Sequence, residues 1–286
     1  MNKLFLPLVI CVVLTACASK KDKATVYCEQ GLVLDSLKDY KGAVAKYDSA
    51  IAINDSLAAL YLARGVAEAS IINSLENKQK AMADFSNAIA LKRGNTAAYI
   101  DKGNVEKALQ QYEDAYDDYS MAIQVDHFCT EAYCKRAFIN CLLKKFEDGI
   151  TDCNKAIEIN PHYSEAFYYR GLIEVQMECY NKTLDFDAAE ADYNKAMSIK
   201  PNYAEAYLSM GFLKSLKGDN AGAINALTRA IEIKPDMMSA YAERGVIYSK
   251  IGDKERGDSD IKRSIALFPN MDTTGAVGEL IKTGCR

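Results

Sequence analysis

The sequence predicts an all-α solenoid built from about seven stacked helix pairs, and three recurring features of the chain support this prediction. A glycine, replaced once by alanine, recurs at intervals of 34 to 40 residues. An aromatic residue stands four positions before each of these small residues, and two further small residues follow, seven positions apart. Self-similarity at such a period is typical of proteins in which each repeat buries its apolar face against the next one.

The first helix of each repeat is expected to carry the aromatic residue and the first small residue. A very small side chain at the latter position lets a neighbouring helix approach closely. These small residues, which we call the ruler residues, are Gly31, Gly65, Gly103, Ala137, Gly171, Gly211 and Gly245. The aromatic residues before them are Tyr27, Tyr61, Tyr99, Tyr133, Phe167, Tyr207 and Tyr241.

The second helix of each repeat is expected to hold two more small residues around one bulky position. Counted after the ruler residue, the next of these is the second small residue of the repeat, and we use that name for it. In the seven repeats it is Ala43, Ala81, Ala115, Gly149, Ala189, Ala223 and Gly257. The bulky position holds Tyr47, Phe85, Tyr119, Cys153, Tyr193, Leu227 and Ile261. In the last four repeats a proline ends this helix, since proline lacks the amide that would continue it: Pro161, Pro201, Pro235 and Pro269.

This register resembles the tetratricopeptide repeat over residues 24–271, almost the whole chain after the N-terminal segment. The resemblance implies a right-handed superhelical solenoid of about seven tetratricopeptide helix-turn-helix repeats. Their ranges are 24–57, 58–95, 96–129, 130–163, 164–203, 204–237 and 238–271. Four extra residues in the second repeat and six in the fifth fall between the two helices, where they should lengthen a helix or a loop without breaking the stack.

The N-terminus has the features of an export signal. Lys3 precedes an apolar run of about eleven residues, which is too short to span a bilayer core. The following segment, Leu14 to Cys17, resembles the bacterial lipobox, which implies a signal peptide at residues 1–16 and lipidation of Cys17. Ordinary cleavage after Ala18 and a retained anchor are the alternatives. A tether at residues 17–23 would hold the folded part within about 20 Å of the lipid.

The C-terminal residues 272–286 are expected to form a short capping tail. Val277, Leu280 and Ile281 fall at helical spacing, and Gly284 would end that helix. A lipid anchor on an exported bacterial chain leads us to expect a location in the cell envelope. Ala18 after the lipidated cysteine resembles the preference for sorting to the outer membrane, on the side that faces the periplasm.

The residues of the chain point to no catalytic, cofactor or metal site. Only two histidines exist, and no phosphate-binding loop or nucleophile motif is present, so we expect no enzyme activity. His127, Cys129, Cys134 and Cys141 could be read as a zinc site, but the last two would lie roughly 10 Å apart along one helix, too far for one tetrahedral ion. The acidic groups around residues 113–118 and 185–192 lack ligand spacing and are expected to be solvated helix faces.

Seven cysteines remain besides Cys17 and Cys11, which lies in the signal segment. An odd number does not suit a disulfide framework, and most of them occupy helical positions where a small apolar side chain packs well. Free, packed thiols are therefore expected, with a pair that involves Cys179 or Cys285 left open.

The first helices are expected to line a concave groove that binds another protein. Their residues outside the aromatic and glycine core are largely apolar, which suits an apolar peptide or an amphipathic helix. The groove candidates are Leu62, Val66, Ile100, Asn104, Lys107, Phe138, Tyr168, Leu172, Leu208 and Phe212. The repeats that grip acidic chaperone tails carry lysine where this chain has Ile100 and Cys134, so that subtype is not indicated.

These observations together predict a membrane-anchored, non-catalytic adaptor of the bacterial cell envelope that binds a partner peptide or helix. The net charge of −4, with no long basic run, argues against nucleic acid as the partner. The alternative is a self-assembling structural envelope protein, in which the groove receives a segment of another copy and a homo-oligomer forms.

Overall fold

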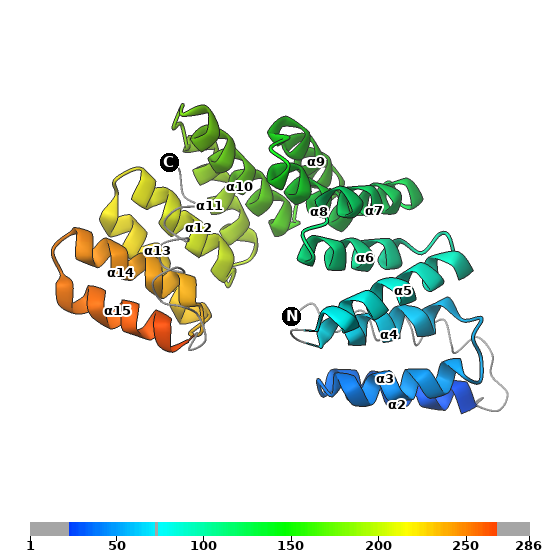
Figure 1. Cartoon of the computed structure of the whole chain (residues 1–286). Coiled ribbons are helices and arrows are strands. Elements are labelled where there is room, and N and C mark those ends of the chain that lie inside the picture. Colours follow the sequence, from blue (N-terminus) through cyan, green and yellow to red (C-terminus); the bar gives the residue numbers. More distant parts are fainter. Residues whose placement is uncertain (1–22, 72–73, 268–286) are drawn as a thin grey trace. The chain divides into compact units, whose positions relative to one another are not determined.

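The computed structural model describes residues 23–71 and 74–267 of the chain. Within these ranges it consists of fourteen α-helices joined by short turns, without a strand (Figure 1). The all-α prediction is confirmed. The predicted signal peptide, the lipidation site Cys17, the tether up to residue 22 and the capping tail at residues 272–286 lie outside the described residues. Among the described helices, none combines the length and the apolar character that a membrane crossing requires.

Consecutive helices form seven pairs, one for each predicted repeat. We number the repeats by these pairs. The pairs are α2 (Lys23–Ser36) with α3 (Tyr40–Ile51), α4 (Ala58–Ser70) with α5 (Leu75–Leu91), α6 (Thr96–Ala108) with α7 (Tyr112–Val125), α8 (Thr130–Leu142) with α9 (Phe146–Ile159), α10 (Ser164–Asn181) with α11 (Asp187–Ile199), α12 (Ala204–Leu216) with α13 (Asn220–Ile233), and α14 (Met238–Lys250) with α15 (Lys254–Ala266).

The chain divides after Ala132 into two compact units. Unit 1 contains α2 to α7, and unit 2 contains α9 to α15 together with α8 from Tyr133 onward. Inside each unit the second helix of a repeat packs against its own first helix and against the first helix of the next repeat. Inside each unit, neighbouring repeats therefore bury apolar surface against one another, as stacked repeats require.

The ruler glycines are required by the bulky residue of the second helix. A methyl group added at Gly103 would lie 2.8 Å from the Tyr119 ring, and one added at Gly211 would lie 2.6 Å from Leu227. Both bulky side chains are fully buried. In the fifth repeat the carbonyl of Ala189 also lies 3.1 Å from the position of such a methyl group. The glycine thus admits both the bulky side chain and the backbone beside the second small residue, as the sequence pattern predicts.

The fourth repeat shows how the pattern tolerates an exception. Its ruler residue is Ala137, and its bulky position holds the small residue Cys153. Both are fully buried in one core cluster. Since cysteine is much smaller than tyrosine or phenylalanine, the extra methyl group of Ala137 finds space that the ring would occupy elsewhere.

The two insertions lengthen helices, as expected. Helix α5 has 17 residues and α10 has 18, whereas the other described helices have 12 to 14. In the fifth repeat the chain then leaves α10 through Lys182, whose φ of 59° lies in the left-handed region. The added residues in the second repeat lie next to the pocket described below.

Candidate functional site

The predicted groove residues lie on the first helices, and they differ in how far they are buried. We call the ten of them the first-helix face. In unit 1, Leu62 and Ile100 are buried, with 7% of each residue exposed, so they serve mainly as core. The half-buried members in unit 1 are Val66, Asn104 and Lys107, and those in unit 2 are Phe138, Tyr168, Leu172, Leu208 and Phe212.

In unit 2 the first-helix face is rich in aromatic rings. Tyr168 stands at the centre, with its ring centroid 5.3 Å from that of Tyr169 and 5.0 Å from that of Tyr203. Phe138 lies 5.6 Å from Tyr169, so rings of two successive repeats are in contact. Burial raises the pKa of the Tyr168 hydroxyl, in keeping with its apolar surroundings. These rings stabilise the stack and also leave apolar edges at the surface.

In unit 1 a pocket of about 250 Å³ opens between α4, α5 and α6. We call it the α4–α6 pocket. It includes two predicted groove residues, Val66 and Asn104. The Asn104 side-chain oxygen accepts a hydrogen bond of 2.9 Å from the Tyr119 hydroxyl, which holds the amide in place. The full lining is Val66, Ala69, Ser70, Lys78, Phe85, Asp101, Asn104, Val105 and Ala108.

The sequence analysis missed the buried ion pairs inside the repeats, and its expectation that Asp118 and Asp192 are solvated was wrong, because both are buried in such pairs. In the second repeat the Arg64 guanidinium donates two hydrogen bonds of 2.7 Å to the two oxygens of Asp84, a buried carboxylate. The cation always precedes the ruler residue, and the aspartate follows the second small residue by three positions. The equivalent pairs are Lys102 with Asp118, Arg136 with Asp152, Arg170 with Asp192 and Arg244 with Asp260.

A further acid accompanies three of these pairs. Glu68, Glu106 and Glu174 stand three residues after the ruler glycine, and each has a buried Oε2 that accepts no hydrogen bond from a described residue. Burial raises the pKa of Glu68 and of Glu174 to about 7, and it also raises the pKa of Glu106. In the fourth repeat Asn140 takes this position, and its Nδ2 donates to Asp152 at 3.2 Å.

The arginines also connect neighbouring repeats. Arg170 Nη1 donates to the side-chain oxygen of Asn154, on the second helix of the preceding repeat, at 2.6 Å. Arg64 reaches Asp48 and Arg244 reaches Thr228 in the same way, at 2.6 and 2.9 Å. Because Arg64, Arg170 and Arg244 are hydrogen-bonded both within and between repeats, these side chains position the helices.

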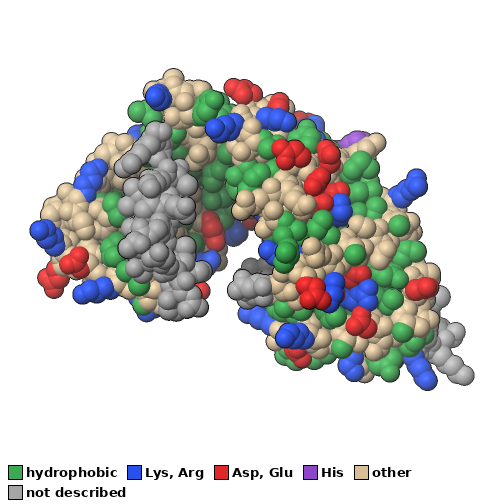
Figure 2. Space-filling view, in the orientation of Figure 1, with side chains coloured by type: hydrophobic (Ala, Val, Ile, Leu, Met, Phe, Trp, Pro, Cys, Tyr) green, Lys and Arg blue, Asp and Glu red, His purple; other side chains and the backbone are tan. Residues whose placement is uncertain are grey.

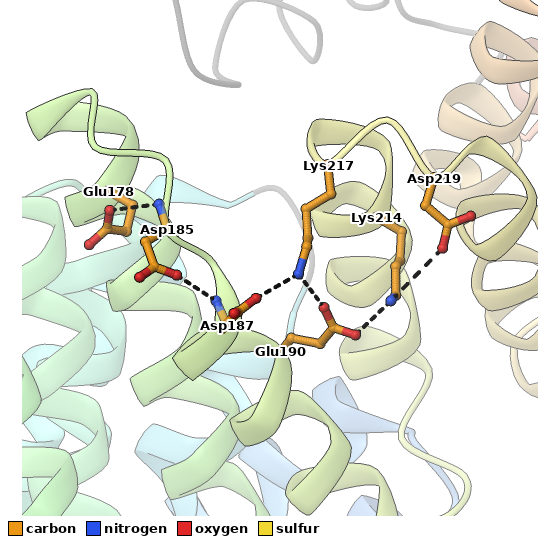
Figure 3. Close-up of polar contacts among 7 residues, drawn as sticks. All are labelled: Glu178, Asp185, Asp187, Glu190, Lys214, Lys217 and Asp219. Atoms are coloured by element: carbon orange, nitrogen blue, oxygen red, sulfur yellow. Dashed lines mark hydrogen bonds and ion pairs between the residues drawn. The ribbon is translucent and has the colours of Figure 1, made fainter.

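The second acidic group of the sequence forms a bridge between the fifth and sixth repeats (Figure 3). Glu190 on α11 accepts hydrogen bonds from Lys214 and Lys217 of α12, at 2.6 and 2.8 Å. Lys217 also bonds Asp187 at 2.8 Å. Lys214 and Lys217 lower the pKa of Glu190. These carboxylates are therefore engaged by lysines, rather than simply solvated as expected from the sequence.

Most of the described cysteines are packed in the core. Cys28, Cys134, Cys141 and Cys153 are buried and form no disulfide, and burial raises the pKa of Cys141 to about 12. Cys129 is also free and half-buried, while Cys179 is disulfide-bonded. Cys285 lies outside the described residues. Within residues 23–71 and 74–267, no group of three or more His, Cys, Asp or Glu side chains is arranged to hold a metal ion.

Charges of both signs are mixed on the face of the described residues that Figure 2 shows. On the face drawn in Figure 2, lysine, arginine, aspartate and glutamate side chains alternate with hydrophobic ones, and no single sign covers a large area of the described residues. A nucleic-acid site would need a cluster of positive charge, which this face does not present.

Comparisons with known proteins agree with this architecture. The family model described as tetratricopeptide repeat matches residues 173–203 and 204–237, and the second of these segments coincides with the predicted sixth repeat. No curated protein sequence matches the chain significantly. Similar solved structures, in contrast, are numerous.

Three solved structures illustrate the likeness. A tetratricopeptide repeat protein from Parabacteroides merdae is 19% identical, with a TM-score of 0.70 over 91% of this chain and 98% of that one. A chain of the Cut9-Hcn1 hetero-tetramer is 14% identical, with a TM-score of 0.72 over 96% of this chain and 51% of that one. PilW, a type IV pilus biogenesis factor, is 15% identical, with a TM-score of 0.59 over 71% and 91% of the two chains. The seven helix pairs therefore have the tetratricopeptide repeat fold, and residues 173–237 match the family model itself.

Proposed function

We propose that this chain is a non-catalytic scaffold whose first-helix face binds a peptide or helix of another protein. The tetratricopeptide fold itself suggests a protein-interaction scaffold. The observation that carries the proposal is the set of large apolar side chains in unit 2 that remain half-buried on the first helices, among them Phe138, Leu208 and Phe212. Covering apolar surface of this kind with a partner lowers the free energy of the complex.

We further infer that the scaffold is anchored to a membrane of the bacterial cell envelope through Cys17, as an outer-membrane lipoprotein that faces the periplasm. The support is the short apolar signal segment and the cysteine that follows Leu14, Thr15 and Ala16. Mass spectrometry of the N-terminal peptide from the purified protein tests this inference. A diacylglycerol-modified Cys17 is expected in the wild-type chain, and an unmodified peptide would contradict the anchor.

Crosslinking in cells tests the binding face. A photoreactive residue at Phe138 or Phe212 should capture one defined partner protein. A photoreactive residue at Lys195, which is exposed on the second helix α11, serves as the matched control and should not capture it. Capture of only lipid, or equal capture from Lys195, would contradict the proposal. Capture of a second copy of the chain would instead favour the self-assembling alternative, which light scattering would then show as an oligomer.

A further inference from the structure

The α4–α6 pocket lies where four of the other six repeats place an aromatic ring; the sixth and seventh have Asn220 and Lys254 there. Three positions before the second small residue, the first, third, fourth and fifth repeats all have an aromatic side chain. These residues are Tyr40, Tyr112, Phe146 and Phe186. The second repeat has Lys78 at this position, and Lys78 lines the pocket.

The walls of the pocket match the surroundings of a buried ring in unit 2. Phe146 is 6% exposed and belongs to a core cluster with Cys141, Cys153 and Ile173. By position in the repeat, the counterparts of these three neighbours are Ala69, Phe85 and Val105, and all three line the pocket.

The buried ring of the fifth repeat has equivalent surroundings. Phe186 is 4% exposed and clusters with Val175, Tyr193 and Leu213. These neighbours occupy the same three repeat positions as Ala69, Phe85 and Val105. The second repeat has therefore kept the walls of an aromatic site while its own side chain at the centre is a lysine.

The size and chemistry of the pocket suit a ring from outside the chain. Its volume of about 250 Å³ exceeds that of an apolar protein cavity of about 150 Å³ that is known to bind benzene. The Lys78 ammonium has no ion pair or hydrogen bond with any described residue, although the side chain is half-buried. Asn104 Nδ2 likewise has no described acceptor, because only its oxygen is engaged by Tyr119. Asp101 also lines the pocket but is engaged in an interaction of its own, so the two available donors favour an acceptor of negative charge.

We propose that the α4–α6 pocket is a subsite for one aromatic side chain of the bound partner, and that Lys78 contacts an aspartate or glutamate next to that residue. The proposal deepens the proposed function and rests on it. The ring would occupy the space that Phe146 and Phe186 fill in their own repeats, so the partner completes a packing position that the second repeat leaves open. Lys78 would interact with the partner's carboxylate and with the face of its ring.

A peptide library provides the test. The probe is a library of random twelve-residue peptides, displayed without a free C-terminus and selected on the purified full chain. We expect the selected peptides to share a phenylalanine or tyrosine beside an acidic residue. A second, otherwise identical library displays peptides with a free C-terminus. If binding requires that free C-terminus, the carboxylate comes from a chain end, and the proposed acidic side chain is overturned.

Three variants locate the binding. Lys78→Phe supplies the missing ring from within the chain, so it should raise Tm and weaken the selected peptides at least about tenfold. Lys78→Gln keeps the pocket and should lose only the preference for an acidic residue. Lys92→Phe, at an exposed position at the end of α5, is the matched control and should change neither.

Failures of the subsite and of the scaffold can be told apart. If Lys78→Phe binds the selected peptides as tightly as the wild type, while Phe212→Glu abolishes their binding, the subsite is wrong and the binding face stands. If no peptide is enriched on the wild-type chain in either library, both proposals are overturned. A rise in Tm for Lys78→Phe, with binding unchanged, would show that the cavity is filled but that the partner does not use it.

Discussion

The fourth and fifth repeats lie in the same unit and meet the same packing requirements with different residues. The fifth repeat combines Gly171 with the large ring of Tyr193, and its buried cluster contains Arg170, Asp192 and Glu174. The fourth combines Ala137 with the small Cys153, and its cluster contains Arg136, Asp152 and Asn140. A change at one position is thus matched by a change at the position it contacts.

This difference separates two sources of stability. The glycine and tyrosine of the fifth repeat depend on steric fit, which any larger ruler residue would break. The charged cluster of the fifth repeat contains one cation and two acids, whereas that of the fourth contains one cation, one acid and an amide that donates to the acid. We therefore expect the stability contributed by the fifth repeat to depend on pH, and that of the fourth repeat not to.

The largest effect is expected from the steric part of the comparison. Gly171→Leu would place its Cβ 3.0 Å from the Tyr193 ring and 3.1 Å from the Ala189 carbonyl, and the backbone cannot give way cheaply. We expect the free energy of unfolding to fall by more than about 3 kcal/mol. Ala137→Gly, the reverse change in the fourth repeat, should cost only about 1 kcal/mol, because it removes one methyl group from a helix. Urea unfolding of both variants measures the difference, and equal losses would disprove the proposed packing.

The repeat pattern could be read from the sequence because each packing rule concerns residues at fixed spacing. Gly103 and Tyr119 recur sixteen positions apart as Gly31 and Tyr47, so the helix pairs and their order followed directly. The compensation of Ala137 by Cys153 was also visible in the aligned positions, although only the structure shows that the two are buried in one cluster.

The charged clusters and the pocket were harder to predict, for physical reasons. Arg170 and Asp192 recur in register in other repeats, but charged residues on helices are usually solvated, so burial was the missing information. A signal did exist, since a cation preceded five of the seven ruler residues. The pocket exists because position 78 holds a lysine in place of an aromatic ring. This can be recognised only when the structure shows which residues surround Phe146 and Phe186.

The next largest effect should come from removing the cation. Arg170→Met leaves Asp192 and Glu174 close together without their cation, and we expect a loss of about 3 kcal/mol at pH 8. Arg136→Met leaves Asp152 with the Asn140 donor and should cost less. The two variants should be compared by urea unfolding at pH 8 and pH 5, because protonation of Glu174, whose pKa is about 7, should narrow the gap between their losses at pH 5. A larger loss for Arg136→Met would contradict this account.

The fourth repeat can be converted to the charge pattern of the fifth. Asn140→Glu removes the Nδ2 donor to Asp152 and adds a second acid in a buried position. At pH 8 this change should destabilise the protein by about 1–2 kcal/mol, since a buried charged group would lack a partner. At pH 5 the new carboxyl should be largely protonated and the loss should shrink. Thermal unfolding at the two pH values provides the measurement, and a loss that is the same at both would refute the charge argument.

The smallest effect is expected for Glu174→Gln, the opposite change in the fifth repeat. Burial is the main cause that raises the pKa of Glu174 to about 7, the Asp192 charge adds to it, Arg170 opposes it, and Glu178 contributes a smaller increase. The folded state therefore holds this proton more tightly than the unfolded chain, where the pKa is near 4.5. The contribution of Glu174 to stability is full below about pH 4.5 and is lost as pH rises through 7.

Glu174→Gln should therefore stabilise the protein at pH 8 by about 1 kcal/mol and leave it nearly unchanged at pH 4.5. Glu68→Gln provides the same test in unit 1, because the pKa of Glu68 is also raised to about 7 by burial. Glu255→Gln, at an exposed position in the first turn of α15, is the control and should not reproduce the pH-dependent gain. If Glu174→Gln is destabilising at pH 8, the ionised carboxylate stabilises the fold through Arg170. The fifth repeat then gains stability from a negative charge that the fourth repeat replaces with the amide of Asn140.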